Sequence, residues 1–145
     1  MKKRPADVKP ALDAVNYGRS LRALGFNLLV KDVPRAVRFA REVLGATSLY
    51  DDVDFAAMRL SGADYMLHAD HTYRDHPLSG IVQGVEARGI GVELRVYDAD
   101  PDAIEARARA LGYTVLAGTM DKPHGTRECM IIDDDGFVWA PGKAI

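Results

Sequence analysis

Two glutamates in strand-like runs are the acidic residues best placed to perform chemistry. A carboxylate that faces a pocket, such as that of Glu93, recognises a cation or acts as a general base. Glu93 could instead form a surface ion pair with Arg95 or Arg127. Glu128 directly follows Arg127, so one of these two side chains faces the inner side of its sheet and the other faces outward. The sequence leaves a pocket role and a surface ion pair open for both glutamates.

Histidine and cysteine offer fewer possibilities. His68 and His71 form a His-x-x-His pattern, but residues three apart on a strand point to opposite faces and do not chelate one ion together. His68 is therefore either a hydrogen-bonding group in a pocket or a hydrated histidine at a strand end. His71, His76 and His124 lie in loops and are expected either to be solvated or to contact a ligand as flap residues at the cleft mouth. Cys129 lies in a strand without a nearby activating group, which predicts a small core residue.

These residues belong to a pattern that occurs twice. Residues 25–32 form a strand-like run from Gly to Asp, and residues 91–98 form a second one. Each run continues through a proline into an amphipathic segment and ends at Leu-Gly. The closing pairs are Leu44-Gly45 and Leu111-Gly112. An internal repeat of this kind is a stronger guide to fold than any local motif.

Each half has the element order β-α-β-β-β. The predicted strands are residues 24–30, 47–50, 55–60 and 64–69 in the first half, and 92–96, 113–117, 128–132 and 137–140 in the second. Helices are expected after Asp32 and Asp100, and a loop is expected over 120–126. The predicted fold is α+β, with two tandem modules whose curved mixed sheets surround a cup and whose helices cover the outer face.

The expected organisation is one domain preceded by a polar arm. Residues 1–22 form the arm and residues 23–145 form the domain. Module 1 spans about 24–70, a polar linker spans 71–89, and module 2 spans about 90–143. The arm could lie on a neighbouring subunit.

Composition excludes several classes of function. Apolar residues make up 48% of the 145 residues, and the net charge is −2. Nucleic acid is not expected as a partner, because phosphate binding needs clustered cations. No apolar run is long enough for a secretory signal or a membrane span, so a membrane partner is not expected either. A single cysteine fits a reducing compartment, which predicts a cytoplasmic protein.

The chain resembles the vicinal oxygen chelate superfamily, which includes glyoxalases, bleomycin-resistance proteins and extradiol dioxygenases. The resemblance covers about residues 24–143. It is carried by the segments 28–32, 39 and 43–45, and by the closing hairpin from Arg127-Glu128-Cys129 through Asp133-Asp134-Asp135-Gly136-Phe137-Val138-Trp139.

The resemblance implies four places where metal-using members hold their ion. Mapped onto this chain they are Gly25, Met66, Gly91 and Ala140, none of which is a ligand for a hard metal. We therefore expect no metal and no other cofactor. If those places face the cup, strand alternation adds further cup residues. The predicted ligand-binding residues are Asn27, Met66, His68, Glu93 and Glu128.

These expectations favour a member similar to the bleomycin-resistance proteins, which sequester a molecule without altering it. The protein is expected to bind a small organic ligand in a cup completed by a second copy of the chain, as a homodimer. The alternative is a metal-dependent lyase, isomerase or dioxygenase with shifted ligands drawn from Asn27, His68, Glu93 and Glu128. A metal-free enzyme with Glu93 or His68 as base, and a structural or regulatory protein with a filled cup, are the remaining rivals.

Overall fold

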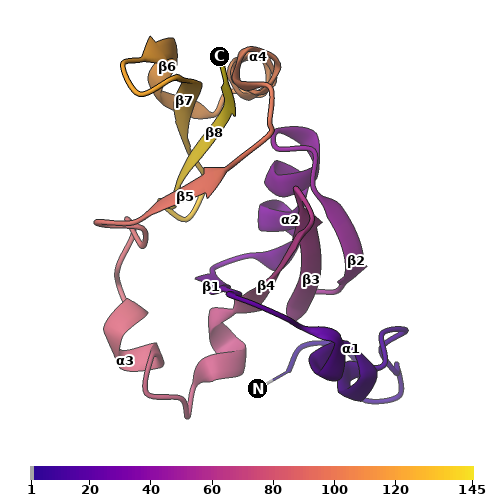
Figure 1. Cartoon of the computed structure of the whole chain (residues 1–145). Coiled ribbons are helices and arrows are strands. Elements are labelled where there is room, and N and C mark those ends of the chain that lie inside the picture. Colours follow the sequence, from indigo (N-terminus) through magenta and orange to yellow (C-terminus); the bar gives the residue numbers. More distant parts are fainter. Residues whose placement is uncertain (1) are drawn as a thin grey trace.

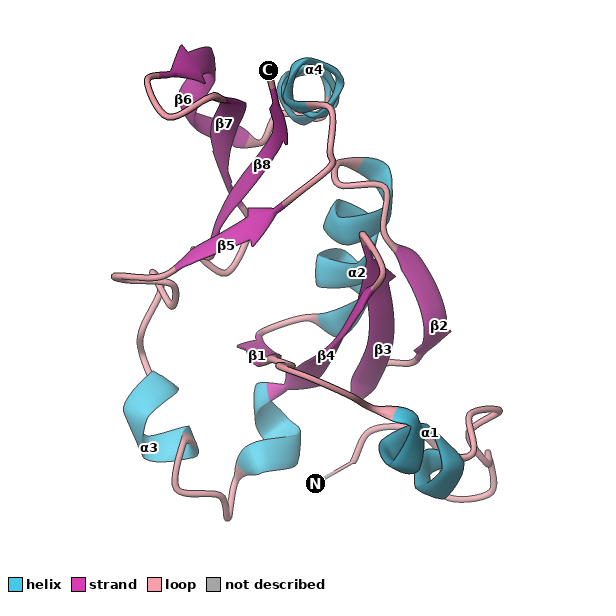
Figure 2. Cartoon of the chain, viewed as in Figure 1, coloured by secondary structure: helices cyan, strands magenta, loops and turns pink. Residues whose placement is uncertain are grey.

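The chain folds into two β-α-β-β-β modules, each with an open four-stranded mixed sheet (Figures 1 and 2). The computed structural model describes residues 2–145. In module 1 the elements are β1 (Asn27–Val30), α2 (Val33–Glu42), β2 (Thr47–Asp51), β3 (Phe55–Leu60) and β4 (Ala63–Ala69). In module 2 they are β5 (Glu93–Val96), α4 (Pro101–Ala110), β6 (Thr114–Lys122), β7 (Thr126–Ile132) and β8 (Val138–Ala144). The predicted α+β architecture is confirmed.

The two sheets have the same topology. Their strand orders are β1-β4-β3-β2 and β5-β8-β7-β6. The first strand of each module pairs in parallel with the last, and the other pairs are antiparallel. Both sheets are open, so β1 and β5 are edge strands.

Short helices occupy the segments outside the sheets. Helix α1 (Ala14–Ser20) lies in the N-terminal segment, and the connection between the modules contains a 3-10 helix, η1 (Asp70–Tyr73), and α3 (Ser79–Val82). The prediction of a loop over 120–126 is wrong at its start. Strand β6 continues through Lys122 across two register shifts, which leaves only a short turn before Thr126. No helix within residues 2–145 has both the length and the apolar character that crossing a membrane requires.

Local sequence explains how helix α2 begins and which side it buries. The Asp32 carboxylate accepts a hydrogen bond from the backbone N–H of Arg35 at 2.9 Å, which caps the first turn. Pro34 occupies that first turn, where its missing N–H costs nothing. The buried side of α2, which packs on the sheet of module 1, consists of Val33, Val37, Phe39 and Ala40.

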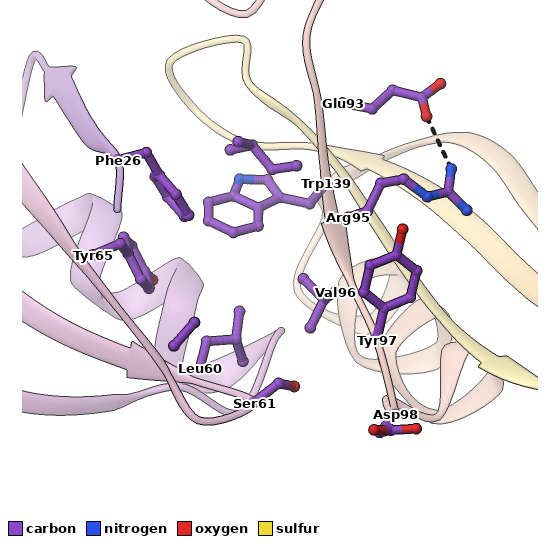
Figure 3. Close-up of a pocket in the computed structure, with 12 residues that line it drawn as sticks. Phe26, Leu60, Ser61, Tyr65, Glu93, Arg95, Val96, Tyr97, Asp98 and Trp139 are labelled. Atoms are coloured by element: carbon purple, nitrogen blue, oxygen red, sulfur yellow. Dashed lines mark hydrogen bonds and ion pairs between the residues drawn. The ribbon is translucent and has the colours of Figure 1, made fainter. Parts of the chain in front are cut away.

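The helix-side faces of the two sheets meet in one shared core. The Trp139 ring of β8 lies 5.8 Å from the Tyr65 ring of β4 and 6.3 Å from the Phe39 ring of α2. Phe26 joins this cluster, stacked on Tyr65 at 4.9 Å, and Figure 3 shows these rings turned toward one another. Tyr65 and Trp139 are each 2% exposed, which confirms their prediction as core residues.

The position of this core decides where the other face of each sheet lies. Because strand residues alternate, those opposite the helix side form what we call the open face of each sheet. By strand register, the open face of module 1 carries Asn27, Phe55, Met66 and His68. The open face of module 2 carries Glu93, Arg95, Glu128 and Ala140. Both helix-side faces turn toward the shared core, so one chain does not close a single cup around both open faces.

Candidate functional site

His68 is the centre of a neutral hydrogen-bonded group on the open face of module 1. Parallel pairing of β1 with β4 brings it beside Asn27, whose amide oxygen lies 2.7 Å from His68 Nδ1. The Asn27 amide nitrogen donates to the Tyr73 hydroxyl at 2.8 Å. Because the amide oxygen can only accept, Nδ1 carries the imidazole proton and Nε2 is left as an acceptor. Burial lowers the pKa of His68, which keeps the ring neutral near pH 7.

Aromatic rings hold this imidazole in place. The ring centroid of His68 lies 4.7 Å from that of Phe55 and 5.1 Å from that of Tyr73. The Tyr73 ring in turn contacts the His76 ring in a tilted arrangement, with centroids 4.5 Å apart. His76 is exposed, as expected for a loop histidine, and its ring contacts the outer side of Tyr73.

A cavity of about 250 Å³ lies against these residues, and we call it the module 1 pocket. Most of its wall is apolar, and it is formed by three separate parts of the chain. The sheet and η1 contribute Tyr50, Asp54, Phe55, His68 and Thr72, and the N-terminal segment contributes Lys2, Arg4, Pro10, Leu12 and Ala14. The pocket therefore lies between the open face of module 1 and the N-terminal segment.

A buried carboxylate fastens the N-terminal segment beside this pocket. Asp54 is 2% exposed and accepts hydrogen bonds from the backbone N–H groups of Lys3 and Arg4 at 2.7 and 3.0 Å. His71 Nε2 lies 2.7 Å from the same carboxylate. Burial alone would raise the pKa of Asp54, but these hydrogen bonds outweigh it and lower the pKa to about 2. The expectation that His71 is solvated is wrong, because a buried acid distant in sequence binds it.

The open face of module 2 is charged, and its charges are satisfied. The Glu128 carboxylate is 3% exposed and is hydrogen-bonded to Arg95, with Lys122 Nζ at 3.8 Å. Burial would raise the pKa of Glu128, yet the Arg95 hydrogen bond and nearby cations hold it below its ordinary value. Glu93 accepts from the same guanidinium at 3.0 Å, as Figure 3 shows. Arg127 lies on the opposite face, as the sequence predicts.

Glu128 is not available as a strong base, and Glu93 shares the same guanidinium. A carboxylate paired with a guanidinium loses basicity, because protonation would break a charge-assisted hydrogen bond. A second hollow, of about 330 Å³, lies between the modules beside the shared core (Figure 3). Its polar rim includes the Arg95 guanidinium that already serves the two glutamates. Of these two hollows, the module 1 pocket is the one beside which a neutral polar acceptor remains.

Strand register corrects one of the four places at which the superfamily binds metal. Leu29 pairs with His68 in module 1, and the equivalent Arg95 pairs with Ala140 in module 2. The place equivalent to Ala140 is therefore His68 and not Met66. Met66 and Ala140 each lie four residues after a hairpin glycine, Gly62 or Gly136, and that spacing is the basis of their assignment. The spacing fails because β3 and β4 are joined by a tight turn at residues 61–62, whereas the turn between β7 and β8 is longer.

The corrected places still do not fit a metal ion. Gly25, Gly91 and Ala140 have no donor side chain, and His68 is a single imidazole whose Nδ1 is bonded to Asn27. Within residues 2–145, no group of three or more His, Cys, Asp or Glu side chains is arranged to hold a metal. A catalytic site needs about three converging protein ligands and an open position. Gly91 has a φ of +78°, a conformation suited to glycine at a tight strand start.

The predicted site residues fall into two groups. Asn27, Met66 and His68 lie together on the open face of module 1, and Glu93 and Glu128 lie together on that of module 2. Sequence reasoning missed Phe55, Tyr73, Asp54 and the wall formed by Leu12. Phe55 could have been found from strand alternation once β3 was paired with β4. The other three act through contacts far apart in sequence, for which no local pattern exists.

Comparison with known proteins gives one family match. The model of the Glyoxalase/Bleomycin resistance protein/Dioxygenase superfamily matches residues 22–140. A search of curated proteins found no match.

Solved structures with the same fold are numerous and distant in sequence. A glyoxalase-related enzyme from Fulvimarina pelagi has a TM-score of 0.67 and 17% identity, over 85% of this chain and 88% of that one. A protein of unknown function from Agrobacterium tumefaciens str. C58 has a TM-score of 0.68 and 22% identity, over 87% and 96%. TioX from Micromonospora sp. ML1 has a TM-score of 0.62 and 22% identity, over 86% and 97%. Identities this low establish the fold alone.

Proposed function

Because the chain belongs to the Glyoxalase/Bleomycin resistance protein/Dioxygenase superfamily, we propose that it binds a small organic molecule without a catalytic metal. The observation that carries this proposal is His68, a neutral imidazole fixed by Asn27 beside an apolar cavity. Its Nε2 has no hydrogen-bond partner among the described residues. A fixed acceptor in an apolar cavity is the usual composition of a ligand site.

The pocket indicates the chemical class of the ligand. A dry cavity of about 150 Å³ holds one benzene ring. The module 1 pocket, at about 250 Å³, therefore has room for roughly two fused rings. Phe55 offers a ring face for stacking, and His68 Nε2 accepts from a hydroxyl or N–H group. The expected ligand is an uncharged, bicyclic or similarly sized molecule that is mainly apolar and carries one hydrogen-bond donor.

Sequestration is favoured over the superfamily's metal-dependent reactions by the donor set. Those reactions rest on an ion that polarises the substrate, and the four corresponding places here offer one imidazole. We expect dialysed protein to contain no stoichiometric zinc, iron or manganese by elemental analysis. We also expect ligand binding to be unchanged by EDTA. A stoichiometric ion bound through three protein atoms would refute sequestration and would require a search for a reaction.

Binding is tested with a matched pair of probes. Titration calorimetry with 2-naphthol, which has a donor hydroxyl, is compared with 2-methoxynaphthalene, which lacks it. The His68→Phe variant keeps a ring but removes the acceptor. This variant should weaken the affinity for 2-naphthol about fivefold, as expected for the loss of one hydrogen bond of about 1 kcal/mol, and leave the affinity for the ether unchanged. His124→Phe, in the turn between β6 and β7, is the control. Equal binding of 2-naphthol to wild type and His68→Phe would exclude this site.

We further propose that the protein acts as a homodimer, in which the open face of one chain is completed by a second copy. The segments on either side of the edge strand β5 support this proposal, because they carry exposed apolar side chains. Ile90 is 79% exposed, Val92 51% and Tyr97 63%. Sedimentation equilibrium should give twice the chain mass, and Ile90→Asp should shift the mass toward one chain. A wild-type monomer at micromolar concentration would refute the dimer.

A further inference from the structure

We infer that residues 2–14 form a strap that closes the module 1 pocket, opens to admit the ligand, and selects ligand size through Leu12. This inference rests on the proposed function, since it assigns a gate and a size filter to the same pocket. It concerns a segment outside the two β-α-β-β-β modules that bear the superfamily fold.

The exposure pattern of the segment is that of a strap lying on a surface. Within residues 2–20, only Arg4, Leu12 and Tyr17 are half-buried, and every other residue is exposed. Helix α1 buries no residue, so its packing supplies little stability. Within the strap itself, residues 2–14, Arg4 and Leu12 are the half-buried residues, so the strap rests on the sheet without forming part of the core.

The strap is fastened at its beginning by polar contacts. Asp54 accepts from the N–H groups of residues 3 and 4, and the Arg4 guanidinium bonds the Asp52 carboxylate at 2.5 Å and the Tyr50 hydroxyl at 3.3 Å. Tyr50 and Asp54 themselves line the pocket. Releasing these contacts would uncover the pocket while leaving the sheet and the shared core intact. Segments with few buried apolar contacts are those that open locally below the cost of global unfolding.

Leu12 contributes an apolar side chain to the part of the wall that the strap forms, and the sheet residues Phe55 and His68 line the same cavity. Pro10 and Ala14 line the same wall but are exposed, so Leu12 is the half-buried apolar residue of the strap that bounds the cavity. The size of this side chain therefore limits the ligand that fits beneath the closed strap. Shortening it should admit a larger ring system.

The test measures strap opening and ligand entry separately on the full-length chain. We call the contacts of Asp54 and Arg4 that fasten the strap the clasp. Hydrogen exchange of the Lys3 and Arg4 amides reports on opening of the clasp. Stopped-flow measurements with 2-naphthol report on how fast the ligand enters the pocket. Asp54→Asn should accelerate both amide exchange and 2-naphthol association about tenfold, as for the loss of hydrogen bonds to a charged acceptor. Arg4→Ala changes an arm residue outside the core, so it tests the clasp even if Asp54→Asn fails to fold. Asp7→Asn, an exposed residue of the strap, is the control.

Leu12→Ala tests the size filter. It should change the relative affinity for 1-hydroxypyrene against 2-naphthol by about tenfold in favour of the larger probe, as for a change of a few carbon atoms in an apolar pocket. An unchanged ratio would overturn the filter.

The outcomes distinguish the gate from the proposed function. If 2-naphthol binds in a manner that depends on His68, but Asp54→Asn and Arg4→Ala leave association unchanged, the gate is refuted and the proposed function stands. If 2-naphthol binds to neither wild type nor Asp54→Asn, the proposed function fails and the gate fails with it. The gate is supported if amide exchange and 2-naphthol association are both faster in Asp54→Asn and in Arg4→Ala, and neither is faster in Asp7→Asn.

Discussion

Replacing Arg95 by methionine should destabilise the protein by leaving the Glu128 carboxylate short of its main partner. Methionine keeps much of the apolar stem of arginine and removes the guanidinium, so the change isolates the charge. Glu128 is 3% exposed, and the remaining cation, Lys122, is 3.8 Å away. The buried acid would then be only partly compensated.

The expected magnitude lies between two limits. Breaking a fully buried ion pair costs about 3–5 kcal/mol, whereas an exposed pair contributes about 0–1 kcal/mol. The side chains of Glu128 and Arg95 are 4% and 31% exposed, which places this pair between the limits. We therefore expect a loss of about 2 kcal/mol, or about 6 °C in Tm for a chain of this size.

The dependence on pH follows from the pKa of Glu128. In the wild type this pKa lies below its ordinary value of 4.5, so ionised Glu128 contributes stability above that pH and loses it as the pH falls. Without Arg95, burial should raise the pKa instead, and the charged form would destabilise the folded state. The deficit of Arg95→Met should therefore be largest near pH 7 and shrink as the pH falls below about 5.

Urea denaturation followed by the fluorescence of Trp139 measures this effect, since Trp139 is the single tryptophan and is buried. Adding Glu128→Gln to Arg95→Met should recover most of the lost stability, because the uncompensated charge is removed. Arg109→Met is the control and should change stability little, because this arginine is 60% exposed and its partner Glu105 keeps its hydrogen bond from the Thr119 backbone. A loss below about 0.5 kcal/mol at pH 7, with no recovery in the double variant, would refute this account of module 2.

Three further predictions concern single residues. The pKa of Asp54 is about 2 against an ordinary 3.8, so Asp54 should contribute about 2 kcal/mol above pH 4 that is lost between about pH 4 and 2. Acid titration of Asp54→Asn should lack this component, and identical acid profiles for wild type and variant would contradict it. Trp139→Phe removes the 2.9 Å hydrogen bond from Trp139 Nε1 to Asp133 and part of the inter-module contact, which should cost about 2–3 kcal/mol. Denaturation followed by circular dichroism measures this cost, and a change within about 0.5 kcal/mol would count against the shared core. Burial raises the pKa of Cys129 to about 11, so native protein should react with a thiol reagent far more slowly than urea-unfolded protein, and equal rates would show an accessible thiolate.

The duplicated order of elements could be predicted from sequence because it depends on local signals. Asp32 followed by Pro34, together with the Leu-Gly pairs, marked where the helices begin and end. Strand alternation also assigned Trp139 and Tyr65 to the core. The end of β6 could not be predicted from local sequence, since two register shifts carry the strand past Gly118 into a segment rich in turn-forming residues.

The candidate site was predictable only in part. Alternation along β1 and β4 correctly grouped Asn27 with His68, but it could not show that the shared core turns the two open faces apart. That arrangement depends on how the modules dock, which involves residues far apart in the chain. The role of Asp54 was hidden for the same reason, because its partners lie about fifty residues earlier.

The division of charge between the modules argues for where the ligand binds. On module 2, Arg95 is shared by Glu93 and Glu128, so the polar groups of that face already satisfy one another. A ligand there would have to compete with charge-assisted hydrogen bonds, which are the stronger kind. On module 1, Asp54 and the Asp52–Arg4 pair are used to hold the strap, and the imidazole of His68 remains neutral. An apolar ligand with one donor therefore gains its hydrogen bond on module 1 without displacing an ion pair, and this difference favours module 1 as the binding half of the fold.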